Sequence, residues 1–377
     1  MSTKLMPVTL TTVLLGGTAI ADVPSVAVDI APVHSLVARV MDGVGSPDLV
    51  IPPGASPHEY NLRPSEAEAL QNANVVFWMG EDLTPWLEDA VENLTTDAAI
   101  TTLLEIDETN LLDFREGALF EAHDHGNDEH GDHDEHEHGD DEHAEEKHGH
   151  DEHAKGDHEH EEHAEKEHEH DKHAEDEHGH EEHAEDDHDH DHEEHAEDEH
   201  GHEGHDHGAH DPHAWLSPDN ASSWLNVIAA KLSAVDPENA GAYFANAAAG
   251  RSEIEALKGE ISATLDPARG KSFVVFHDAY QYFETAFDFP ASGAISLGDA
   301  ADPSPARIAE IQDRVRDEGV DCVLSEPQYN PGIVAVVLDG TEANTGVLDP
   351  LGSDLEPGPE MYPQLLRNLA GVLADCL

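Results

Sequence analysis

The stretch DPENAGAYFANAAAGRSEIEALKGEISATLDP, residues 236–267, decides how the rest of the chain is divided. Asp236 is a good helix cap, Pro237 suits the first helical position, and Asp266-Pro267 ends the run. Apolar residues recur between them at helical spacing: Tyr243, Ala247, Ile254, Leu257, Ile261 and Leu265. This pattern predicts a helix over 236–266, longer than the globular average. Such a helix either joins two lobes rigidly and limits hinge opening, or is an ordinary core helix of the first lobe.

Short apolar runs alternate with helical stretches on both sides of that helix. The predicted strands are 26–30, 48–51, 75–79, 272–276, 291–296, 321–325 and 346–348. The predicted helices are 65–72, with a capping-box pattern of Ser65 and Glu68, and 305–318 and 362–373. The sequence therefore predicts an α/β fold of two (βα)-type lobes joined by a long rigid helix. We expect the N-terminal lobe over 22–122 and 211–235, and the C-terminal lobe over 267–377.

The middle of the chain has a different composition. Residues 121–210 contain 28 of the 32 histidines, and 40 acidic residues against four lysines. From His143 the pair His-Ala recurs every ten residues. Because alanine is its only apolar residue type, this stretch cannot join a core, so we expect a disordered, metal-binding insertion over 123–210. Its charge of −36 leaves −31 of the total −67 on the rest of the chain, which argues against nucleic acid as a partner and favours a cationic ligand.

The insertion is predicted to hold several zinc ions weakly and to raise the metal concentration near a tighter site. The alternative is a solvated spacer with incidental metal affinity. The histidines singled out as auxiliary ligands are His123, His125, His130, His143, His153, His163, His173, His183, His205, His207 and His210. Because imidazole protonates near pH ~6.5, we expect metal loading to fall as the pH drops through that value.

Residues 1–21 have the form of an export signal. Lys4 precedes a mostly apolar or small run over 6–20, and Ala19-Ile20-Ala21 suits signal peptidase. The alternative is a buried N-terminal helix. No later segment is apolar for long enough to span a membrane. We therefore expect a periplasmic protein, monomeric and without stable membrane insertion.

Cys322 and Cys376 are the two cysteines of the chain. In an oxidising compartment such a pair is expected to form a disulfide rather than to ligate metal as thiolates. A bridge over about 54 residues would stabilise the fold by roughly 4 kcal/mol.

Four residues outside the insertion are candidate metal ligands. His58 lies in a loop beyond a strand and two prolines, and His213 lies in a stiff turn before a helix that Ser217 or Asp219 would cap. His277 and Asp349 each follow a strand, at the edge where open α/β sheets bind ligands. Three imidazoles and a carboxylate suit tetrahedral zinc, whereas manganese prefers more oxygen ligands. His34 opens a helix and is interpreted as structural.

Five ordered motifs carry a family resemblance: GASPHEY over 54–60 with LRPS over 62–65, DPHAWLSP over 211–218, FHDAY over 276–280, SEPQ over 325–328 and LDPLG over 348–352. Together with the histidine-rich insertion, they resemble the zinc-specific periplasmic binding proteins of the cluster A-I solute-binding family. The resemblance covers nearly all of the mature chain. It implies a C-clamp of two lobes with zinc in the interlobe cleft, held by His58, His213 and His277.

The fourth ligand stays open. Some family members have a carboxylate immediately before the first histidine, where this chain has Pro57. This departure favours Asp349 or a water, with Glu59 as a weaker candidate.

The resemblance implies a carrier that captures Zn²⁺ and delivers it to an ABC permease and its ATPase, and not an enzyme. Alternatives are a periplasmic zinc buffer without a transporter, or a manganese or iron carrier of the same family. A zinc hydrolase would need an open coordination position and a base such as Glu59, but no His-Glu-x-x-His helix is present.

Overall fold

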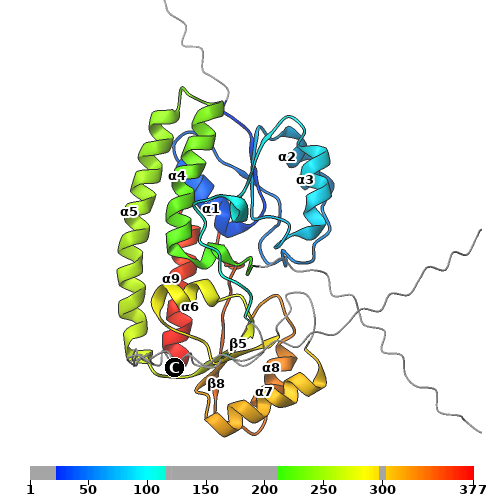
Figure 1. Ribbon diagram of the computed structural model, residues 1–377, viewed down its shortest axis with the longest axis vertical. Coiled ribbons are helices and arrows are strands. Elements are labelled where there is room, and N and C mark those ends of the chain that lie inside the picture. The colour runs from blue at the N-terminus through cyan, green and yellow to red at the C-terminus, as the bar shows by residue number, and fades with distance from the viewer. Residues whose placement is uncertain (1–22, 116–119, 121–209, 297–302) are drawn as a thin grey trace, which may run out of the picture. The chain divides into compact units, whose positions relative to one another are not determined.

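The computed structural model describes residues 23–115, 120, 210–296 and 303–377 (Figure 1). The predicted export signal lies outside the described residues. So does the predicted insertion, apart from His210 at its end. Within the described ranges, no helix combines the length and the apolar character that crossing a membrane requires.

The first sheet is parallel and has the strand order β2-β1-β3-β4. Its strands are β1 (Val26–Val28), β2 (Asp48–Leu49), β3 (Val75–Trp78) and β4 (Ala99–Thr102). The strand β4 was not predicted, because its short and largely exposed residues form no apolar run. The helices that connect the strands of this sheet are α1 (Ala31–Met41), α2 (Pro64–Asn72) and α3 (Glu88–Leu94). Two 3-10 turns, η1 (Pro85–Leu87) and η2 (Leu103–Glu105), lie in the same part of the chain.

The start of α2 corrects the predicted capping box. The helix begins one residue early, at Pro64, and Arg63 takes the cap position. The Glu66 carboxylate accepts the Arg63 backbone N–H at 2.7 Å. Ser65 and Glu68 therefore lie inside the helix rather than at its cap, because Pro64 already supplies the fixed backbone angle of a first helical residue.

The second sheet is also parallel, with the strand order β6-β5-β7-β8. Its strands are β5 (Phe273–His277), β6 (Gly293–Ser296), β7 (Cys322–Ser325) and β8 (Asn344–Val347). Its helices are α6 (Gln281–Phe287), α7 (Pro305–Glu318), α8 (Pro331–Leu338) and α9 (Met361–Cys376). These two sheets confirm the predicted α/β class with two lobes.

The predicted long helix is α5 (Ala240–Leu265), and it follows α4 (Pro218–Val235). It begins four residues later than predicted, with Asn239 at its cap. Asp236 instead ends α4, and its carboxylate accepts hydrogen bonds from the Tyr243 hydroxyl (2.8 Å) and the Asn239 side chain (2.7 Å). The bond from Asn239 closes the turn between α4 and α5, and the bond from Tyr243 ties this turn to the first residues of α5. The side chain of Ser217 accepts the N–H of Asn220 and caps α4, which confirms one of the two predicted caps.

Within the described ranges, both α5 and α9 contact elements of the two lobes. The helix α5 packs against α4 and α1 along its upper part in the view and against α9 and α6 along its lower part (Figure 1). The C-terminal helix α9 packs on β8 and also reaches α1, where the Tyr362 N–H donates to the Ser35 hydroxyl at 2.9 Å. That hydroxyl in turn donates to the Gly358 carbonyl at 2.6 Å. The lobes are thus joined along a helical layer.

The buried apolar residues of the described chain form two hydrophobic cores. One continuous hydrophobic core contains residues of both sheets, including Phe77 of β3 and Val275 of β5. A second, smaller core lies between the other face of the second sheet and the helices α7 and α8, and includes Val274 and Phe276. Successive residues of β5 therefore enter different cores, as the alternation of side chains in a strand requires.

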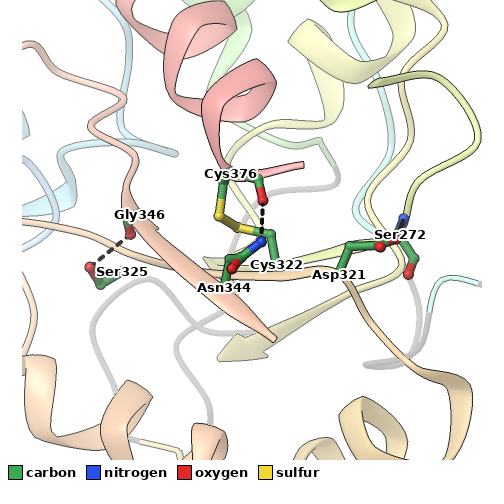
Figure 2. Close-up of a disulfide and its surroundings, with 7 residues drawn as sticks. All are labelled: Ser272, Asp321, Cys322, Ser325, Asn344, Gly346 and Cys376. Atoms are coloured by element: carbon green, nitrogen blue, oxygen red, sulfur yellow. Dashed lines mark hydrogen bonds between the residues drawn. A yellow bond between two sulfur atoms is a disulfide. The ribbon is translucent and has the colours of Figure 1, made fainter. Parts of the chain in front are cut away.

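The disulfide joins Cys322 of β7 to Cys376 of α9, with their Cα atoms 5.9 Å apart (Figure 2). This confirms the predicted pair. Beside it the Asn344 side chain donates to the Cys376 carbonyl at 2.9 Å. Since a Cβ at Gly346 would lie 3.1 Å from Val372, glycine allows α9 to pack closely on β8. The bridge fastens the last helix to the second sheet.

Candidate metal centre

Three histidines from distant parts of the chain meet in one pocket. His58 lies in the loop after β2, His213 immediately precedes the turn η3 (Ala214–Leu216), and His277 is the last residue of β5. Each offers one ring nitrogen to a group whose ligand atoms all lie within 4.8 Å of one another. The side chains of His213 and His277 are buried, and His58 is half-buried. This separation and chemistry suit a single tetrahedral cation.

The ring of His213 is held by the carboxylate of Asp211. One oxygen, Oδ1, accepts both the backbone N–H of His213 at 2.9 Å and its ring Nδ1 at 2.7 Å. Burial raises the pKa of Asp211, while these contacts with His213 act in the opposite direction. Because an ionised carboxylate can only accept, Nδ1 must carry the proton and Nε2 has the lone pair. The nitrogen of His213 that can bind a metal ion is therefore Nε2.

His277 has the same arrangement in the second lobe. The Glu326 Oε1 accepts the backbone N–H of His277 at 3.1 Å. The ring Nδ1 lies 2.8 Å from Oε1 and 2.7 Å from Oε2 of that carboxylate. Glu326 follows β7, which pairs with β5 in register, so the strand order itself places the two side chains together. A carboxylate behind a ligand imidazole fixes the ring and raises its basicity.

His58 is presented by a loop rather than by a strand end. The indole N–H of Trp86 donates to the carbonyl of Pro57 at 2.7 Å, and the His58 backbone N–H donates to the Ser56 hydroxyl at 3.3 Å. Its ring centroid lies 5.4 Å from that of His213 and 6.1 Å from that of His277. The loop thus supplies the most exposed of the three rings.

Asp349 and Glu59 do not join the group of ligand atoms. The Asp349 carboxylate accepts the backbone N–H groups of Leu351 (3.0 Å) and Ser353 (2.5 Å) and the side-chain amide of Gln328 (3.2 Å). Glu59 is exposed. The structure therefore brings together three of the predicted ligands, and a fourth ligand from Asp349 or Glu59 stays a prediction.

Aromatic and apolar groups complete the pocket. The His213 ring lies 5.2 Å from that of Trp215, and the His277 ring lies 5.2 Å from that of Tyr329. The indole of Trp215 donates to the Pro350 carbonyl at 2.9 Å, which ties the His213 segment to the loop after β8. Gln328 also lines this pocket. The rings of His213 and His277 are buried among these side chains, and a cation interacts more strongly with ligands that are shielded from water.

Sequence reasoning missed two positioning residues, Asp211 and Glu326. Asp211 stands two residues before His213, where an Asx turn can form, and this spacing could have indicated its role. Glu326 gave no such signal, because its neighbour His277 is 49 residues away.

The remaining predicted histidines lie elsewhere or outside the described residues. His210 pairs with Asp113 at 2.9 Å, beside an antiparallel bridge between the same two residues. The other auxiliary histidines lie outside the described ranges. His34 is buried in α1, with Nε2 3.1 Å from the Pro47 carbonyl, in agreement with a structural role.

Residues 26–376 match the model of the family described as zinc-uptake complex component A periplasmic, ZnuA. The chain belongs to this family. A ZnuA of Paracoccus denitrificans, named a high-affinity zinc uptake system protein, is 42% identical over 358 residues, which cover 95% of this chain and 93% of that protein. A protein of the same name from Brucella abortus is 40% identical and covers 93% of this chain and 91% of its own length.

Solved structures of low sequence identity support the fold. A crystal structure of ZnuA has a TM-score of 0.62 at 17% identity and covers 94% of this chain and 99% of that one. The solute-binding protein FpvC of Pseudomonas aeruginosa, described in complex with Mn²⁺, has a TM-score of 0.61 at 17% identity, with coverage of 94% and 98%. The fold of the ZnuA family alone therefore does not decide which metal is bound.

Proposed function

We propose that this chain is a periplasmic solute-binding protein that captures Zn²⁺ between its lobes and delivers it to an ABC permease for high-affinity uptake. The observation that carries the proposal is the group of three imidazoles within 4.8 Å. Two of them are held by carboxylates through Nδ1, so that Nε2 can bind metal. The names of the curated relatives agree with this role.

Zinc is favoured over manganese by the kind of ligand present. Neutral imidazole suits zinc, and manganese prefers carboxylate, carbonyl and water oxygens. The carboxylates of Asp211 and Glu326 contact Nδ1 of His213 and His277, and the group of possible ligands found among the described residues consists of three histidines. A manganese or iron carrier is the alternative within the same family.

The proposed division of labour follows the predicted domains. Residues 22–122 with 211–235, and residues 267–377, would form the two lobes that hold the cleft site. The helix over 236–266 would join them, and the insertion over 123–210 would gather zinc for the cleft. Export by residues 1–21, a monomeric state, and coupling to an ATPase beside the permease belong to the same proposal. ZnuA is a transport family, and the proposed role requires no catalysis.

A growth test separates a carrier from a zinc buffer. A strain that lacks the chain is grown in zinc-poor medium and complemented with the wild type, with His58→Ala/His213→Ala/His277→Ala, or with Gln364→Ala, on the exposed side of α9, as a control outside the pocket. We expect the wild type and the control to restore growth, and the triple variant not to. If the strain grows like its parent without the chain, the protein does not serve uptake and the buffer interpretation replaces this one.

A further inference from the structure

Gln328 lies in the metal pocket, and the NH₂ group of its side-chain amide is already hydrogen-bonded. It lines the same pocket as the three histidines. Its Nε2 donates to Oδ1 of Asp349 at 3.2 Å and to the Ser353 hydroxyl at 3.1 Å. Its Oε1 is buried and has no hydrogen-bond partner among the described residues. A buried acceptor left in this state destabilises the fold unless a ligand or water supplies the missing hydrogen bond.

The carboxylate of Asp349 decides which end of the Gln328 amide faces it. Oδ1 of Asp349 also accepts the backbone N–H of Leu351, so a carboxylate acceptor faces the Gln328 amide. Exchanging the amide oxygen and nitrogen would place two acceptors against each other, which is unfavourable. Oε1 must therefore be the end that does not face Asp349.

Asp349 itself is poorly placed to become a ligand. Its two oxygens already accept three hydrogen bonds, from Leu351, Ser353 and Gln328. Gln328 lines the pocket of the histidines, and Asp349 does not. To bind the metal directly, the carboxylate would have to give up contacts that hold the loop after β8. Gln328 already connects this carboxylate to the pocket.

We propose that Gln328 completes the metal site: its Oε1 accepts a hydrogen bond from a water bound to zinc in the fourth position, and Asp349 acts through Gln328 by orienting the amide. This rests on the proposed zinc site at the three histidines. Gln328 is then a positioning residue for the fourth ligand. A neutral oxygen here would leave the site without a ligand carboxylate, which disfavours manganese.

The test is competition with a zinc chelator that reports only the tightest site of the full-length chain. The variants are Gln328→Met, which removes both ends of the amide, and Gln328→Glu, which retains an oxygen but loses the NH₂ donors. Gln364→Met is the control, because Gln364 contacts Asn368 on the exposed side of α9. His277→Ala reports on the site itself, and thermal unfolding of each metal-free chain checks the fold.

We expect Gln328→Met to weaken zinc binding about 10- to 100-fold, as the loss of outer contacts at metal sites does. Gln328→Glu retains an acceptor for the water but loses the NH₂ group that Asp349 orients, so it should weaken zinc binding less than Gln328→Met does. The control should bind as tightly as the wild type. If Gln328 only holds the loop through its NH₂ group, the two substitutions weaken binding equally, and the inference is wrong. It is also wrong if neither weakens binding while His277→Ala does, in which case the proposed function stands. Wild-type affinity in His277→Ala would remove the zinc site and the inference together.

Discussion

At the scale of single residues, each of the two buried histidines of the candidate metal centre is supported by one carboxylate that accepts both its backbone N–H and its Nδ1–H. Glu326→Gln keeps the shape of this support for His277 but removes the negative charge that raises the basicity of the ring. We expect zinc affinity to fall about tenfold or more. Chelator competition measures it, with Glu260→Gln, an exposed partner of Arg367, as the control. Unchanged affinity in Glu326→Gln would show that the charge has no part in binding.

A second buried carboxylate governs stability rather than binding. Asp29 follows β1 and accepts the backbone N–H groups of Ile30 and Met79, each at 2.7 Å. Burial raises its pKa from 3.8 to about 7, although these bonds lower it. Between these two values the folded chain holds a proton that the unfolded chain has lost. The contribution of Asp29 to the free energy of unfolding should therefore fall as the pH rises from about 4 to about 7, by up to about 4 kcal/mol.

Asp29→Asn tests this sign, because the amide does not titrate. Urea unfolding of both chains at pH 4.5 and pH 7.5 gives the difference in their unfolding free energies. We expect the wild type to lose stability relative to the variant at the higher pH. A difference that is the same at both pH values would contradict the assignment.

At the scale of elements, two glycines in α5 separate packing from helix propensity. A Cβ at Gly250 would lie 2.9 Å from Leu225 of α4 and 3.3 Å from Arg39 of α1, whereas a Cβ at Gly259 meets nothing within 4 Å. Gly250→Ala should destabilise the fold by about 1–3 kcal/mol through overpacking. Gly259→Ala should stabilise it by about 0.5–1 kcal/mol. Urea unfolding measures both changes, and changes of the same sign would show that α5 does not pack as described.

The elements also show what sequence can predict. Apolar runs overlap with seven of the eight described strands. Five of those seven are buried, as parallel strands covered on both faces are expected to be, whereas β2 and β8 are not. The helix starts were less accurate, since Asp236 and Ser65 are good caps that the fold uses otherwise. The three histidines could be singled out by their places after strands or prolines. Glu326 could not be singled out in this way, because its contact with His277 depends on β5 and β7 being neighbours in the sheet. Neither segment alone indicates that strand order.

At the scale of the whole described chain, segments from both lobes are fastened together near the metal pocket. Arg115, at the end of the segment that precedes the insertion, forms ion pairs with Asp278 and Glu284, beside and within α6. The Tyr282 hydroxyl accepts the Leu112 N–H at 3.0 Å and donates to the Asp211 carbonyl at 2.8 Å. These contacts, with the core that continues through both sheets, favour small lobe movements over wide hinge opening.

Removing the side-chain charge of Arg115 tests how much its ion pairs contribute to the free energy of unfolding. Arg115→Met would leave the carboxylates of Asp278 and Glu284, 8% and 5% exposed, without their cation. We expect a loss of about 3–5 kcal/mol in unfolding free energy. The matched control, Arg367→Met, breaks an exposed pair with Glu260 and should cost much less, because solvent screens an exposed ion pair. Equal losses in the two variants would mean that the buried ion pairs of Arg115 contribute no more to stability than the exposed pair of Arg367.

The most direct test of the zinc site is calorimetric titration of a chain in which residues 123–209 are replaced by a short linker, beside its His277→Ala variant. This replacement removes the competing histidines and keeps His210, Asp211 and all three pocket ligands. We expect one zinc ion to bind tightly per chain, manganese to bind weakly, and the tight site to disappear in the variant. If the shortened chain binds no zinc tightly, or binds it equally well without His277, the pocket is not where this protein holds its metal.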